Sequence, residues 1–192
     1  MKPKNRLERF NKLAGSPKYK AQEILNILSV QPGAIIADVG SGGGFYTQAF
    51  AKAAAPGGLV VAVDTDAENL AYVQDNANAL GLINVQTFLT STDQLELPAR
   101  KFDWIFMRDM YHHILDPLTY FQPIANFIKT KGLVVVIDYK KVKGFSLAFS
   151  SLHHHYSSPT AIRNVMLQVG LDVFRSFDFL PDQSFQIFSL KR

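Results

Sequence analysis

A short apolar strand that runs directly into a glycine-rich turn constrains the fold of this chain more than any other feature. Residues 35–39 form the mostly apolar run, and Gly40, Gly42 and Gly44 follow it at alternate positions. Glycine adopts positive φ readily and lets a ligand come close to the backbone. The alanine-rich stretch 48–55 predicts a helix whose N-terminal N–H groups attract polar or negative groups. The sequence therefore predicts a strand–turn–helix unit that holds a polar ligand.

Strands and helices alternate along most of the chain. The predicted strands cover residues 35–39, 59–63, 85–89, 102–107, 133–138, 171–179 and 184–190. The other predicted helices cover residues 18–28, 67–80, 117–127 (with a break or kink at Pro123) and 159–169, whereas residues 1–15 are expected to be loosely ordered. This alternation implies parallel βαβ units, and the short link at 181–182 predicts that the last two strands form an antiparallel pair. We therefore expect an α/β fold with a C-terminal hairpin.

Composition narrows the class of protein. A chain of 192 residues with 47% apolar and 19% charged residues predicts a single packed domain over 1–192. The absence of cysteine excludes disulfides, thiolate metal sites and a cysteine nucleophile. The basic N-terminus has no apolar core, so we do not expect a signal peptide, and no apolar run approaches the ~18 residues that span a bilayer. We expect a cytoplasmic protein with no membrane partner, and the net charge of +4 indicates a solvated surface.

Two carboxylates follow the next strands of the predicted sheet. Asp64 ends the second strand, 20 residues beyond Gly44. At such a position a carboxylate can accept hydrogen bonds from both ribose hydroxyls of an adenine nucleoside. Asp93 follows the third strand, where a polar side chain can meet the adenine amino group, and Ser91 is the alternative. Phe45 breaks the G-x-G-x-x-G spacing typical of nicotinamide dehydrogenases, so we do not favour that class.

Together these features resemble the class I S-adenosylmethionine-dependent methyltransferases, from about residue 31 to residue 139. Segments 38–44, 60–64, 102–107 and 132–138 are similar to that family's first motif, second motif, fourth strand and fifth strand. The resemblance implies a doubly wound, Rossmann-like sheet of seven strands, mostly parallel with a C-terminal antiparallel hairpin. It also implies S-adenosyl-L-methionine as cofactor. The implied cofactor-binding residues are Asp38, Gly40, Ser41, Gly42, Gly44, Asp64, Asp93 and Arg108.

The resemblance also implies a role for individual residues of this set. The three glycines would pass close to the methionine moiety, and Asp38 would lie near its amino group. Asp64 would hold the ribose, and Asp93 would lie at the adenine. Many relatives have an acidic residue where this chain has Ser91, so the choice between Ser91 and Asp93 stays open.

The acceptor of the methyl group is expected beyond the fourth strand, where His112 and His113 lie. If the acceptor is a hydroxyl, a general base assists the reaction, and both histidines are candidate catalytic residues. Structural packing is the alternative for each. A metal site would require them to converge with the second cluster, His153–His155, and we do not expect one. We expect residues 1–30 to form a helical lid and 140–158 an acceptor-site insert.

The absence of certain sequence motifs narrows the chemical class of the methyl acceptor. Many methyltransferases that act on nucleic-acid bases or protein carry Asn/Asp-Pro-Pro-aromatic after the fourth strand, whereas Arg108-Asp109-Met110-Tyr111 stands here. The sequence is more similar to the small-molecule, type 11-like branch that includes ubiquinone and menaquinone methyltransferases. We therefore predict a small-molecule acceptor and no nucleic-acid partner. A methyltransferase acting on RNA or protein, a non-catalytic cofactor-binding protein and a homodimer stay open.

Overall fold

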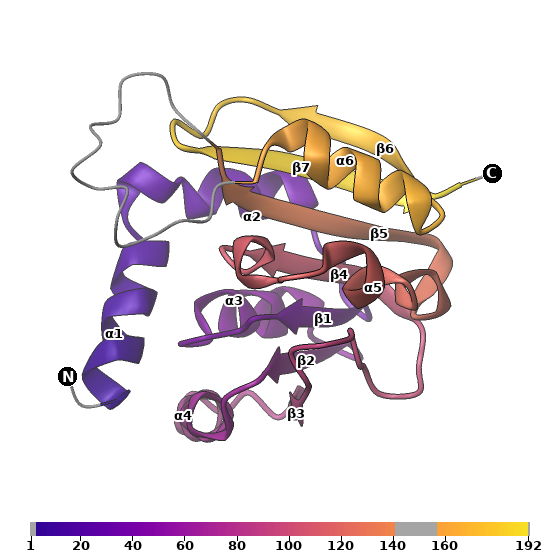
Figure 1. The fold of residues 1–192 in the computed structure, drawn as a ribbon. Coiled ribbons are helices and arrows are strands. Elements are labelled where there is room, and N and C mark those ends of the chain that lie inside the picture. Colours follow the sequence, from indigo (N-terminus) through magenta and orange to yellow (C-terminus); the bar gives the residue numbers. More distant parts are fainter. Residues whose placement is uncertain (1–2, 141–156, 192) are drawn as a thin grey trace.

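The computed structural model describes residues 3–140 and 157–191, which form one seven-stranded sheet with helices on both faces (Figure 1). The strand order is β3-β2-β1-β4-β5-β7-β6. The strands are β1 (Ile35–Val39), β2 (Leu59–Asp64), β3 (Val85–Leu89), β4 (Phe102–Arg108), β5 (Ile128–Tyr139), β6 (Leu171–Phe177) and β7 (Gln183–Leu190). The first five are parallel, and β7 is antiparallel to both β5 and β6. The predicted doubly wound α/β fold and its terminal hairpin are confirmed.

The helices divide between the two faces of this sheet. Their bounds are α1 (Pro3–Ala14), η1 (Pro17–Tyr19), α2 (Ala21–Leu28), α3 (Phe45–Ala54), α4 (Ala67–Ala79), η2 (Tyr111–His113), α5 (Pro117–Phe121), η3 (Ile124–Asn126) and α6 (Pro159–Gln168). Side chains of α2, α3 and α4 share one apolar core, and those of α5, η3 and α6 share the other. The sheet is therefore covered on both sides, as the doubly wound arrangement requires.

The central strands are apolar at nearly every position because helices cover both faces of the sheet. Successive side chains of a strand point to opposite faces, so Ile36 lies in one core while Ala37 and Val39 lie in the other. In β4, Phe106 and its neighbours Ile105 and Met107 divide in the same way. Since neither face meets water, a polar residue inside these strands needs a partner or a function.

The expectation that residues 1–15 are loosely ordered is wrong. Residues Pro3–Ala14 form α1, a helix with buried Leu7 on its inner side. The Asn11 side chain donates to the backbone oxygen of Gly43 at 2.7 Å. A short polar helix is marginal in isolation, and tertiary contacts supply most of its stability. Those contacts join segments far apart in the sequence, which a local pattern cannot show.

Two predicted helices are divided in the structure. The one predicted over residues 18–28 becomes η1 and α2, with left-handed Lys20 between them (φ 49°). The one predicted over 117–127 is interrupted around Pro123, as the missing proline N–H led us to expect. Strand β5 begins at Ile128, ahead of its predicted start. These differences alter boundaries and leave the topology unchanged.

Two expectations concern segments whose structure is only partly described. Most of the predicted acceptor-site insert, residues 140–158, lies outside the described residues. The interpretation of residues 1–192 as a single domain stays a prediction. Among the helices of residues 3–140 and 157–191, none combines the length and apolar character needed to cross a bilayer.

Candidate functional site

The glycine turn after β1 has the backbone that the sequence predicts. Gly40, Gly42 and Gly44 adopt φ of 75°, 51° and 80°, in the left-handed region that favours glycine. Space is also limited, because a Cβ added to Gly40 would lie 2.9 Å from the Cβ of Met110. A Cβ added to Gly44 would lie 2.9 Å from Cγ2 of Val73. The backbone conformation therefore favours glycine at all three positions, and packing also requires it at Gly40 and Gly44.

Asp64, the last residue of β2, faces this turn. Its Oδ2 accepts the N–H of Gly42 at 2.9 Å, and its Oδ1 accepts the backbone N–H of Asp66 at 3.1 Å and the Asn69 amide at 3.2 Å. The residue is only 8% exposed. A carboxylate can accept about four hydrogen bonds. Asp64 is thus oriented toward the glycine turn with accepting capacity left for a ligand hydroxyl.

Two further polar groups are buried at the same turn. Asp38 is buried, and its Oδ2 accepts the Thr47 hydroxyl at 2.5 Å. Burial, helped by the Asp64 charge and opposed by the hydrogen bonds from Thr47, raises the pKa of Asp38 to about 7. The buried hydroxyl of Ser41 has no hydrogen-bond partner among the residues that the structure describes. Buried polar groups normally have partners, so the residues at this turn fit a polar ligand such as the predicted cofactor.

Helix α1 lies against the turn and extends over the end of β2. The bond from Asn11 to Gly43 is joined by two from Arg6, whose Nη2 donates at 2.9 Å to both Asp66 Oδ2 and Asn69 Oδ1. A Cβ on Gly43 would lie 2.3 Å from Oδ1 of Asn11, so helix and turn are in close contact. This placement supports the predicted N-terminal lid, which stays a prediction.

The hydrogen bonds in the loop after β3 do not decide whether Ser91 or Asp93 would contact the adenine ring of the cofactor. The loop after β3 begins beside Asp64, because Thr90 N donates to the Asp64 backbone oxygen at 3.1 Å. In that loop Asp93 is exposed, whereas Ser91 is partly buried and its hydroxyl donates to Gln94 O at 3.3 Å. Both stay candidates for contact with an adenine.

Arg108, the last residue of β4, is held through its two terminal nitrogens by groups from other segments. Its guanidinium lies 5.3 Å from the ring centroids of Tyr19 and of Tyr46. It donates to the Tyr46 hydroxyl, to Tyr19 O at 3.2 Å and to Gln183 Oε1 at 2.8 Å. Burial raises the pKa of Tyr46 to about 12, against the lowering effect of the Arg108 charge. These contacts join the N-terminal segment, α3 and β7, and a cofactor contact by Arg108 stays a prediction.

His112 pairs with a buried carboxylate. Its Nδ1 lies 2.7 Å from Oδ1 of Asp138, and its backbone N–H donates to Oδ2 at 3.1 Å. Asp138 is fully buried near the end of β5. Burial lowers the pKa of His112, but the hydrogen bond and charge of Asp138, helped by the Asp109 charge, leave it raised. Because a carboxylate only accepts, the Nδ1 proton points at Asp138 and the neutral ring keeps its Nε2 lone pair.

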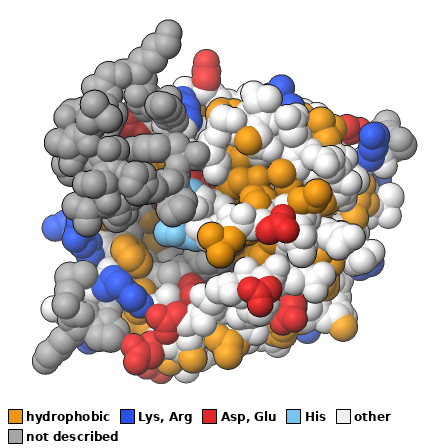
Figure 2. All heavy atoms as spheres, viewed as in Figure 1, with side chains coloured by type: hydrophobic (Ala, Val, Ile, Leu, Met, Phe, Trp, Pro, Cys, Tyr) orange, Lys and Arg blue, Asp and Glu red, His pale blue; other side chains and the backbone are white. Residues whose placement is uncertain are grey.

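The neighbours of His112 differ from it. His113 is exposed, and its ring centroid lies 4.0 Å from that of His112. Tyr111 is buried and stacks on Phe121 at 5.5 Å between centroids, and burial raises the pKa of Tyr111 to about 12. Figure 2 shows histidine side chains at the surface next to hydrophobic ones. His112 is thus held by a buried acid beside an exposed histidine, and a catalytic role for either histidine stays a prediction.

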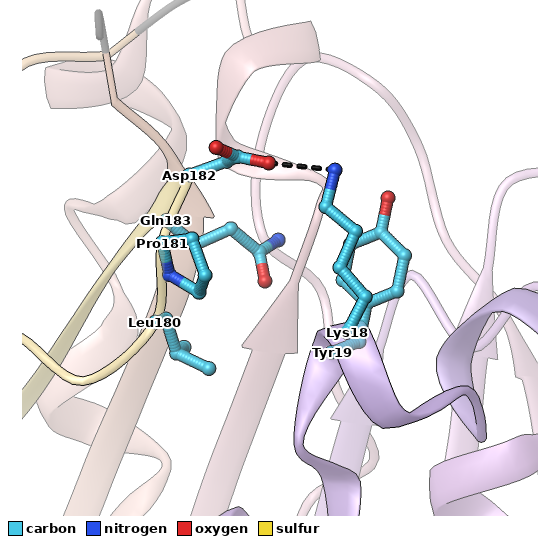
Figure 3. A pocket seen from close by; sticks show the side chains of 6 residues that line it. All are labelled: Lys18, Tyr19, Leu180, Pro181, Asp182 and Gln183. Carbon is cyan, nitrogen blue, oxygen red and sulfur yellow. Dashed lines mark ion pairs between the residues drawn. The ribbon is translucent and has the colours of Figure 1, made fainter.

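Sequence reasoning missed three polar residues of this region. Asp138 lies in the quoted fifth-strand motif without a role, and its signal is a carboxylate in an otherwise apolar strand. Asp109 follows β4 directly and accepts a hydrogen bond from Gln183 of the terminal hairpin. Figure 3 shows Gln183 extending from the hairpin toward Lys18 and Tyr19 of the N-terminal segment, where Lys18 Nζ pairs with Asp182 Oδ2 at 2.7 Å. No local pattern marks Gln183, because its partners lie in distant segments.

No group of three or more metal-ligating side chains occurs within residues 3–140 and 157–191. The second histidine cluster, His153–His155, lies outside that part of the chain. The convergence of the two clusters is therefore not described.

Comparison with known proteins agrees with this geometry. The profile of a family described as "Methyltransferase domain" matches residues 31–172. A ubiquinone biosynthesis O-methyltransferase of Histophilus somni is 33% identical over 105 residues, which cover 52% of this chain and 42% of that protein. A ubiquinone/menaquinone biosynthesis C-methyltransferase of Hydrogenovibrio crunogenus is 25% identical over 119 residues, 62% of this chain and 47% of that protein. The chain thus spans less than half the length of these two relatives.

A solved structure shows the same fold over the full length. The crystal structure of a SAM-dependent methyltransferase from Aquifex aeolicus superimposes with a TM-score of 0.82, covers 98% of each chain and is 21% identical. The seven-stranded arrangement with its terminal antiparallel pair is therefore a shared architecture.

Proposed function

This chain belongs to the methyltransferase domain family, and we propose that it transfers a methyl group from S-adenosyl-L-methionine to the hydroxyl of a small, apolar aromatic acceptor. One observation carries the proposal. The Asp64 carboxylate is oriented at the glycine turn, and the His112–Asp138 pair lies along the same carboxyl edge of the sheet. The first arrangement suits a ribose, and the second suits a general base.

The residues at the glycine turn would hold the cofactor. Asp64 has accepting capacity for ribose hydroxyls, and the buried Ser41 hydroxyl is available for a polar group. Asp38, which is costly to ionise when free, would gain from a cationic amino group beside it. When bound, S-adenosyl-L-methionine supplies an activated methyl carbon. Helix α1, in contact with the turn, would exclude water from it.

His112 would accept the proton of the acceptor hydroxyl at Nε2. Asp138 keeps the Nδ1 proton in place and stabilises the charged ring once the proton has been taken up. A base with a pKa above that of ordinary histidine binds this proton more strongly. The general base is thus His112, and its orientation depends on Asp138.

An acceptor of RNA or protein type is less well supported by the contacts. It requires the basic N-terminal residues to line the acceptor site. Two of them are instead paired with acids of this chain, Arg6 with Asp66 and Lys18 with Asp182. The quinone-pathway relatives support a small aromatic acceptor instead.

Calorimetry and labelled methyl transfer test the proposal together. We expect the protein to bind S-adenosyl-L-methionine and S-adenosylhomocysteine but not NAD. We expect label to pass to phenolic or quinol compounds and not to total RNA or protein. If label passes to RNA or protein alone, the small-molecule acceptor is rejected and a macromolecular acceptor takes its place. Tight cofactor binding without transfer to any of them would indicate a non-catalytic binding protein.

A further inference from the structure

Asp109 has an unusual backbone next to the His112 base. It follows β4 with φ 56°, the left-handed region that residues other than glycine seldom adopt. Its N–H donates to Ile137 O at 3.0 Å, and the same turn places Met110 against Gly40. Strained backbone of this kind persists where the surrounding structure holds it, and it clusters at functional sites. The turn therefore orients the Asp109 side chain as well as Met110.

Two buried side chains hold the Asp109 carboxylate in place. Gln183 Nε2 donates to Asp109 Oδ1, and Gln183 Oε1 accepts from Arg108 Nη2 at 2.8 Å. Because Arg108 can only donate, the Gln183 amide has one orientation, with its N–H groups toward Asp109. Tyr46 and Tyr19 fix Arg108 in turn. The carboxylate is thus positioned by a chain of contacts from β7 and the N-terminal segment. Figure 3 shows Gln183 and Tyr19 of this chain on their two segments.

The other carboxylate oxygen is left for a ligand. Oδ2 of Asp109 lies 3.8 Å from Nε of Arg108, beyond hydrogen-bond distance, and accepts no hydrogen bond from any residue that the structure describes. The Asp109 side chain is 37% exposed, whereas that of Asp138 is completely buried. The backbone of Asp109 is bonded to Ile137, and the next residue, Asp138, holds His112, so Asp109 and His112 are neighbours at this end of β5. Of these two acids, Asp109 is the one that a bound molecule can reach.

Resting on the proposed function, we propose that Asp109 accepts a hydrogen bond from a second hydroxyl of the methyl acceptor, so that aromatic rings with two adjacent hydroxyls are selected. The reacting hydroxyl gives its proton to His112 Nε2 while its oxygen bonds to the methyl carbon and the bond from that carbon to sulfur breaks. The neighbouring hydroxyl keeps its proton and donates to Asp109. A ring without that donor leaves the carboxylate unpaired, and sites built for hydrogen bonding reject such analogues strongly.

Equilibrium binding of matched probes tests the proposal. Calorimetry measures the affinity for 1,2-dihydroxybenzene and for phenol, which lacks the second hydroxyl, with and without saturating S-adenosylhomocysteine. We expect the wild-type protein to prefer the diol by roughly tenfold or more, about one charge-assisted hydrogen bond. In Asp109→Asn and Asp109→Gly, which both tolerate the left-handed turn, the ratio should fall to about one. Gln183→Met should lower it by releasing the carboxylate, and Asp75→Asn, an exposed α4 residue, should not change it.

Each result has one meaning. Absent binding of the diol, no preference in the wild type, or a preference retained in both Asp109 variants overturns the role of Asp109. Methyl transfer from labelled S-adenosyl-L-methionine is measured separately. If the Asp109-dependent preference is found without any transfer, the proposed function fails and the diol site stands.

Discussion

The two halves of the carboxyl edge of the sheet are constructed in different ways. At the glycine turn, the hydrogen bonds of the Asp64 and Asp38 carboxylates join residues 2 to 22 positions apart, and α1 adds longer-range contacts from outside. Beyond β4, the contacts of His112, Arg108 and Asp109 join residues 26 to 89 positions apart. The first half is a local motif, whereas the second exists only once β5, β7 and the N-terminal segment have assembled. Changes in one half should therefore leave the other half functional.

The largest effect is expected from His112→Gln. Loss of the general base should lower turnover by roughly 100-fold or more, the usual contribution of such a group. Cofactor affinity should change little, because His112 belongs to the other half of the edge. Single-turnover methyl transfer measures the first quantity, and calorimetry with S-adenosylhomocysteine measures the second. Retention of near wild-type turnover would remove His112 from catalysis and direct attention to His113.

Asp138→Asn should lower turnover by roughly tenfold or more, and it should shift the pH profile. Wild-type activity should rise with pH as His112, whose pKa is raised, loses its proton. Without the Asp138 charge, the lowering effect of burial dominates, and the midpoint should move to lower pH. An unchanged midpoint would show that the profile reports another group, such as the neighbouring Asp109.

Asp64→Ala tests the opposite half. Removing the carboxylate should weaken S-adenosyl-L-methionine binding by roughly tenfold or more, about one pair of charge-assisted hydrogen bonds. Turnover at saturating cofactor should fall less, because the base and the acceptor site are unaffected. Asp75→Ala removes the same charge from an exposed position of α4 and is the matched control. Equal affinities in the two variants would remove Asp64 from the ribose role.

The last expected effect, from Asp38→Asn, is on stability rather than on turnover. The pKa of Asp38 in the folded state is about 7, above the ordinary 3.8, so the folded state holds a proton that the unfolded state releases. The contribution to stability is full below about pH 4 and is lost as pH rises through about 7. The asparagine variant, which can still accept from Thr47, should gain a few kcal/mol at about pH 8 and little at about pH 4. Denaturant unfolding at both pH values measures this difference.

A stability gain that is equal at both pH values would show that Asp38 is not protonated in the folded protein. The same variant should bind S-adenosyl-L-methionine less tightly, because the amide carries no charge for the amino group. The affinity of this variant for the acceptor should stay close to that of the wild type, because Asp38 belongs to the glycine-turn half and the acceptor is expected in the half beyond β4.

The sequence by itself determined the fold class and the glycine turn with Asp64 beside it, which we propose as the cofactor half of the site. Unbroken apolar strands alternating with helices predict a sheet covered on both faces, and the spacing from Gly40 to Asp64 depends on a single βαβ unit. Only the tertiary structure decided the acceptor half. Asp109, Asp138 and Gln183 acquire their roles from contacts between distant segments, and α1 is helical because it packs against the glycine turn. Local sequence patterns indicate local hydrogen bonding and which face of an element is buried. The side-chain partner of a residue far along the chain depends instead on how the whole sheet and its helices assemble.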